Sequence, residues 1–124
     1  MCYIVYFGSI VDQGTLPLGV EDKRIGNGGL SASSYYNSAL APWHGRLNHR
    51  WSWSPRYRNT KEWLQIYFNL LTRIKGVATQ GRQDADQWVT KYKLSYSKDG
   101  MRFIPYKVGG RVKVLLGFCS VKGR

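Results

Sequence analysis

The segment WVTKYKLSYSKDG, residues 88–100, decides the fold class. Its bulkier side chains recur at every second position, at Trp88, Thr90, Tyr92, Leu94 and Tyr96. This period of two predicts a half-buried β-strand. The strand is followed by Lys-Asp-Gly, and Asp-Gly favours a hairpin turn because it tolerates the positive φ angles of tight turns. The segment therefore indicates antiparallel β-structure.

Other segments support the same class. Glu62–Phe68 (EWLQIYF) alternates apolar and polar positions, and Arg73–Thr79 is rich in residues typical of strands. Arg102–Val108 is predicted as a strand at a sheet edge, because Pro105 cannot donate to a ladder. Residues 35–61 are irregular and rich in Trp, Tyr, Pro and Arg, which is typical of functional loops. The pattern predicts an all-β, antiparallel, sandwich-like domain.

The charge is strongly unbalanced. The chain has 124 residues, enough for one domain, and a net charge of +12. No acidic residue lies between Asp22 and Glu62 or after Asp99. Such a surface fits anionic partners, namely sulfated or sialylated glycans, acidic phospholipid or nucleic acid. A basic soluble protein without such a partner is the alternative.

Cys2 and Cys119 lie near the two ends of the sequence. A disulfide between them would close nearly the whole chain into one loop, and two free thiols are the alternative. No apolar run reaches the roughly 20 residues that a transmembrane helix needs. The apolar stretch from Tyr3 to Val11 lacks a preceding positive charge and a small-residue cleavage pattern, so it is a poor signal peptide.

Catalytic motifs are absent from the sequence. The glycines of residues 25–29 (IGNGG) match neither a P-loop nor a dinucleotide fingerprint, and there is no Gly-x-Ser-x-Gly elbow. His44 and His49 have no carboxylate or thiol nearby in the sequence and are predicted to be loop or aromatic-packing residues. The sequence thus predicts a protein that is not an enzyme.

Several segments, taken in order, resemble the discoidin family, also called the coagulation factor V/VIII type C domain. They are PLGVEDKRIGNGGLSASSYY (17–36), GRLNHRWSWSP (45–55), EWLQIYF (62–68), GVATQGR (76–82) and WVTKYKLSYSKDG (88–100). The resemblance implies an antiparallel jelly-roll β-sandwich of the galactose-binding type. It also implies an extracellular adhesion or recognition module that binds glycans, matrix protein or anionic phospholipid through loops at one end.

Carried over by position, the three ligand loops become Tyr36–Trp43, Arg46–Trp53 and Arg82–Gln87. The candidate ligand-binding residues on them are Asn37, Leu40, Trp43, Arg46, Arg50, Trp51, Arg82, Asp84 and Asp86. The polar third loop suits hydrogen bonding to sugars or to a protein better than insertion into lipid.

Three of these assignments have structural alternatives. Arg46 can tie loops together through hydrogen bonds, and Trp43 can brace its loop instead of stacking on a ligand. Asp84 and Asp86 are weak Ca²⁺ candidates, and an ion pair with Arg82 that stiffens the loop is the favoured interpretation.

The resemblance also sets domain boundaries. It predicts an N-terminal extension at residues 1–14, the domain at 15–117 and a divergent tail at 118–124, with the last strands of the family missing. Missing strands would leave sheet edges unpaired. Two other hypotheses remain: a nucleic-acid binder, suggested by RLNHRWSWSPRYR (46–58), and a truncated fragment without function.

Overall fold

The computed structural model describes residues 17–117, together with the backbone of residues 2–7. The strands are β1 (Cys2–Phe7), β2 (Leu30–Ala32), β3 (Trp63–Tyr67), β4 (Lys91–Ser97), β5 (Ile104–Pro105), β6 (Lys107–Val108), β7 (Arg111–Val112) and β8 (Val114–Leu116). Three single-turn 3-10 helices are η1 (Asn27–Gly29), η2 (Ser38–Leu40) and η3 (Pro42–His44). The described residues contain no α-helix, so the predicted all-β class is confirmed.

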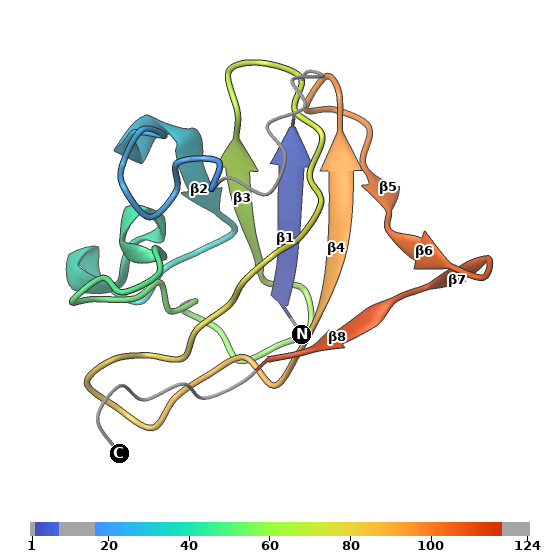
Figure 1. The fold of residues 1–124 in the computed structure, drawn as a ribbon. Helices are drawn as coiled ribbons and strands as arrows, with labels where there is room; N and C mark the ends of the chain where they lie inside the picture. Colours follow the sequence, from blue (N-terminus) through green and yellow to red (C-terminus); the bar gives the residue numbers. More distant parts are fainter. Residues whose placement is uncertain (1, 8–16, 118–124) are drawn as a thin grey trace.

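The strands form a six-stranded sheet in the order β2-β3-β1-β4-β5, with β8 also pairing with β4. Strand β1 runs parallel to both β3 and β4, whereas β2, β5 and β8 pair antiparallel with their neighbours. The segment joining β3 to β4 crosses the face of the sheet, and the hairpin arm of β6 and β7 projects from its β4 side (Figure 1). None of the described helices is long and apolar enough to span a bilayer.

The alternation predicted for Glu62–Phe68 is observed. Leu64, Ile66 and Phe68 are buried, whereas Tyr67 is exposed. Ile66 and Phe68 form one core cluster with Leu30, and Leu64 forms a second one with Tyr92. The buried face of β3 therefore organises the small hydrophobic core.

The turn predicted after β4 is also observed. Gly100 has φ of 78°, and the Asp99 carboxylate accepts hydrogen bonds from the amides of Met101 (2.8 Å) and Arg102 (3.0 Å). These bonds, and first of all that from Arg102, lower the pKa of Asp99 to about 2. Pro105 lies in β5, at the end of the sheet order, as the edge prediction requires.

Several strand boundaries were wrong. Arg73–Thr79 is not a strand, because β3 already has β1 and β2 as neighbours and β4 already has β1, β5 and β8. The segment crosses the sheet instead. The single strand predicted for Arg102–Val108 is divided into β5 and β6, and β4 begins at Lys91 instead of Trp88.

Some boundary predictions concern the ends of the chain. The domain boundaries at 1–14, 15–117 and 118–124 stay predictions, and in the structure Cys2–Phe7 lies in the sheet as β1. Cys119 and the rest of the tail at 118–124 lie outside the described residues, so the Cys2–Cys119 disulfide stays a prediction.

Candidate ligand-binding loops

The first loop is held by its own polar groups. Oδ1 of Asn37 accepts a hydrogen bond from the amide of Leu40 at 3.1 Å and thereby caps η2. The side chain of Leu40 turns inward and is only 6% exposed. Trp43 is half-buried, with its ring centroid 6.0 Å from that of Tyr35. In this structure Asn37 and Leu40 shape the loop, and no apolar side chain of the candidate set protrudes from it.

Arg46 is a buried structural residue. It is 5% exposed, and its guanidinium donates to the carbonyls of Trp43 (3.0 Å), Val20 (2.5 Å) and Ile25 (2.8 Å) and to Oδ1 of Asn27 (3.0 Å). Burial lowers the pKa of Arg46. This geometry fits the structural alternative that the sequence left open, because the guanidinium faces the protein and joins three segments.

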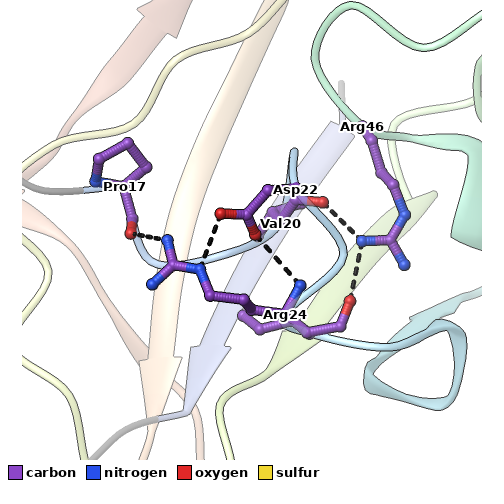
Figure 2. A network of polar contacts seen from close by, with 6 residues as sticks. Pro17, Val20, Asp22, Arg24 and Arg46 are labelled. Carbon is purple, nitrogen blue, oxygen red and sulfur yellow. Dashed lines mark hydrogen bonds and ion pairs between the residues drawn. The ribbon is translucent and has the colours of Figure 1, made fainter.

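A second arginine orders the segment before η1. Figure 2 shows Arg24 beside Asp22, next to the contacts of Arg46 with the protein backbone. Arg24 Nε lies 2.7 Å from Asp22 Oδ2, and Arg24 Nη2 donates to the Pro17 carbonyl at 2.6 Å. The amide and the guanidinium of Arg24 lower the pKa of Asp22. Residues 17–25 are thereby folded into a compact turn against the second loop.

The second loop carries a cation beside an indole. Cζ of the exposed Arg50 lies 5.0 Å from the ring centroid of Trp51, a distance suited to a cation–π contact. The Trp51 amide donates to Nδ1 of His49 at 3.1 Å, which fixes the backbone at the base of the pair. A planar cation and an aromatic face are thus presented together.

The histidines pack as predicted. The rings of His44 and His49 have centroids 5.1 Å apart, and His44 is also 6.0 Å from Trp43. Burial is the main cause of the lowered pKa of His44, and the neighbouring His49 and Arg46 add to it. The packing of both rings fits the predicted loop or aromatic-packing role.

The third loop is closed by Arg82. Its Nε lies 2.6 Å from Asp84 Oδ1, its Nη1 donates to Gln87 Oε1 at 3.0 Å, and its amide donates to the Gln87 carbonyl at 2.9 Å. The side-chain hydrogen bond is the main cause that raises the pKa of Arg82 and lowers that of Asp84. This is the ion pair favoured by the sequence analysis. Among the described residues no cluster of three or more His, Cys, Asp or Glu could hold a metal, and Ca²⁺ at Asp84 and Asp86 stays an untested prediction.

The first two loops are joined through the backbone. The Tyr36 amide donates to the Ser54 carbonyl at 2.9 Å, and the Ser54 amide donates to the Leu40 carbonyl at 3.1 Å. Beneath them, the buried Glu62 carboxylate accepts from the hydroxyls of Ser33 (2.6 Å) and Ser34 (2.5 Å). Ser33 and Ser34 therefore anchor the loops to the start of β3.

The second loop also meets the segment that leads into the third. The Asn48 amide donates to Gln80 Oε1 at 2.8 Å. A cavity of about 650 Å³ is lined by His49 and Trp51 from the second loop and by Gln83 from the third. In Figure 1 the chain between β3 and β4 descends to the end of the sheet where β3 and β4 begin, on the side of the loops that precede β3.

Four residues near these loops are exposed; the sequence had already suggested Arg56 and Arg58, with Arg50, as contacts for an anionic ligand, with a solvated surface as the alternative. Tyr36 is 66% exposed, Tyr57 is 57% exposed, and the flanking Arg56 and Arg58 are exposed as well. The amide of Arg56 donates to the Ser34 hydroxyl at 3.0 Å, which fixes this stretch to the same anchor. Only Tyr57 was not considered, and its place between Arg56 and Arg58 in a segment without acids is the sequence signal for it.

Comparison with known proteins gives one family. The model of the F5/8 type C domain matches residues 29–118. Human coagulation factor VIII is 33% identical over 121 residues, covering 89% of this chain and 5% of that protein. Bovine lactadherin is 36% identical over 107 residues, covering 77% of this chain and 25% of that protein. The chain thus spans a small part of each relative, and the matches confirm the resemblance and the antiparallel β-sandwich class expected from the sequence.

Proposed function

This chain belongs to the F5/8 type C domain family, and on that premise we propose that it is an extracellular recognition module that binds carbohydrate through the loops around Arg50. Sulfated glycans are the ligand class that fits best. They combine anionic groups for the arginines with pyranose faces for the aromatic rings. The proposal includes no catalytic step.

The observation that carries the proposal is the pairing of Arg50 with Trp51 in the second loop. Tyr36, in the first loop, is 66% exposed. The guanidinium and the indole lie 5.0 Å apart, and the first loop, which carries Tyr36, is bonded to the second through Ser54. A sulfate can accept hydrogen bonds from Arg50 while the sugar ring stacks on an aromatic face.

The character of the loops favours sugar over insertion into a bilayer. Membrane insertion requires apolar side chains that project from the surface. Leu40 is buried, and Trp43 is half-buried against Tyr35. The third loop presents an ion pair between Arg82 and Asp84. Charged side chains such as these suit a polar ligand better than the interior of a bilayer.

The test compares variants with equal charge on a heparin column. Arg50→Ala removes the cation over Trp51, and Lys107→Ala removes one charge from the exposed strand β6, away from the loops. We expect Arg50→Ala to elute at distinctly lower salt than Lys107→Ala, and Tyr36→Ala to weaken binding without any change of charge. Equal elution of the two charge variants would reduce the interaction to net charge alone.

Vesicles distinguish the ligand classes. Anionic phospholipid vesicles are titrated into the protein and tryptophan emission is followed, with neutral vesicles as the control. The proposal predicts weak, salt-sensitive association without a blue shift. A strong blue shift that survives high salt would identify a lipid-inserting module and overturn the proposal.

A further inference from the structure

A pair of histidine rings packs at the start of the second loop. The rings of His44 and His49 have centroids 5.1 Å apart and an interplanar angle of 35°. A tight turn brings them together: the amide of Arg46 donates to the His44 carbonyl at 2.8 Å, and the amide of His49 donates to the Arg46 carbonyl at 3.3 Å. Asn48, within this turn, has a φ of 55°, which lies in the left-handed region. The turn therefore sets the positions of both rings.

The ring of His49 supports the part of the loop that carries Arg50. Nδ1 of His49 accepts a hydrogen bond from the amide of Trp51 at 3.1 Å. A backbone amide only donates, so Nδ1 carries no proton while this bond exists. The indole of Trp51 in turn lies 5.0 Å from Cζ of Arg50. Protonation of Nδ1 would therefore break the contact that holds the Arg50–Trp51 pair in place.

The surroundings of His44 favour its uncharged form. Burial is the first cause of its lowered pKa, followed by the positive charge of His49. Arg46 and Lys23 act in the same direction, and a backbone hydrogen bond with Ser38 opposes them. Because the pKa in the folded protein lies below the ordinary value of 6.5, the unfolded chain binds the proton more readily, and stability falls as the pH drops below 6.5. Acidification therefore acts against this arrangement of the rings.

Little negative charge is available to neutralise two protonated rings. Both histidines line the cavity of about 650 Å³, together with the charged residues Glu21, Arg46, Arg73 and Lys75. Glu21 is the one acid among the described lining residues, and its Oε1 accepts from Nδ2 of Asn48 at 2.7 Å. Arg50, next to His49 in the sequence, is a further cation. Two added charges 5.1 Å apart would therefore repel each other and the nearby arginines.

We propose that His44 and His49 form a pH-sensitive support of the second loop: protonation at mildly acidic pH releases Trp51 and Arg50 from their positions and weakens the binding of an anionic glycan. The part of this inference that concerns glycan rests on the function proposed above. Imidazole is the side chain whose charge changes between about pH 5 and pH 8, so the support responds within the physiological range. Loss of one supporting hydrogen bond corresponds to an affinity change of about fivefold.

Calorimetry with a heparin oligosaccharide measures the effect on binding. The affinity should be about fivefold weaker at about pH 5.5 than at about pH 7.5. Net charge alone predicts the reverse, because protonation adds positive charge to the protein while the sulfates of heparin stay ionised. His49→Asn is the matched control, because its Oδ1 can replace Nδ1 as the acceptor for the Trp51 amide but does not titrate. In this variant the weakening at acidic pH should disappear.

Nuclear magnetic resonance of the unliganded, isotope-labelled protein measures the loop itself. The amide resonance of Trp51 should shift with the same midpoint as the ring protons of His49, and it should stay fixed in His49→Asn. The amide of Ser54, which donates to the Leu40 carbonyl at 3.1 Å, is the internal control and should shift little.

A Trp51 amide that does not follow the titration of His49 would overturn the proposal, and so would equal or tighter heparin binding at the lower pH. Absence of heparin binding at neutral pH would instead reject the proposed function, and the Trp51 resonance would still decide whether protonation releases the loop. If His49→Asn does not fold, the sign of the pH effect and the Trp51 titration in the unaltered protein decide.

Discussion

Replacing Arg46 tests whether this arginine builds the loops or binds the ligand. In Arg46→Met the alkyl stem is approximately preserved, but the carbonyls of Trp43, Val20 and Ile25 and the Asn27 amide oxygen lose their donors. At about 1 kcal/mol for each lost bond, the free energy of unfolding should fall by about 4 kcal/mol. This is a large part of the roughly 5–15 kcal/mol that stabilises a typical domain.

The assay is urea unfolding followed by tryptophan fluorescence at neutral pH. Arg46→Lys is the matched control, because an ammonium group can reach about half of the acceptors and should lose about 2 kcal/mol. Folded Arg46→Lys should keep the heparin elution of the unaltered protein. A loss below about 1 kcal/mol in Arg46→Met, or a selective loss of heparin binding in a stable Arg46→Lys, would refute the structural role.

Three further changes probe the turns and the third loop. The pKa of Asp99 is lowered to about 2, so its stabilising effect is complete above the ordinary value of 3.8 and is lost as the pH falls from there towards 2. In Asp99→Asn the urea midpoint should therefore depend less on pH in this range. Asp84→Asn should release the guanidinium of Arg82 and raise the salt needed for heparin elution with little change in thermal midpoint, whereas unchanged elution would show that Arg82 does not face the ligand. Gly19→Ala should destabilise the protein by more than about 1 kcal/mol in urea unfolding, because Gly19 has φ of 99° and a Cβ would lie 2.7 Å from Cβ of Arg24; an unaltered midpoint would contradict the geometry of that turn.

The arm that contains β6 and β7 is exposed to solvent. Residues 101–114 are exposed throughout, including Phe103, Ile104, Tyr106 and Val108. The arm pairs with the sheet through β5 and β8, and its turn at Gly109 and Gly110 uses positive φ angles. Its apolar side chains therefore belong to the surface of the described structure.

The local sequence pattern predicted the structure correctly where the conformation depends on residues close together in the chain. The alternation in Glu62–Phe68 predicted the burial of Leu64, Ile66 and Phe68, because side chains on a strand alternate between the faces. Asp99 and Gly100 predicted the turn after β4, because its hydrogen bonds lie within four residues. The segments resembling the discoidin family identified the domain family.

Only the tertiary structure decided which of the candidate arginines is buried and which is exposed. Arg46 and Arg50 are four residues apart and have the same side chain, yet one is buried among backbone carbonyls and the other lies over an indole. The strand expected at Arg73–Thr79 is absent for a related reason, since β1 lies between β3 and β4 and pairs with both. Sequence determines the side chains and the conformations that neighbours along the chain can stabilise. Burial and strand pairing depend on segments far apart in the chain, so they are fixed only when the whole chain is folded.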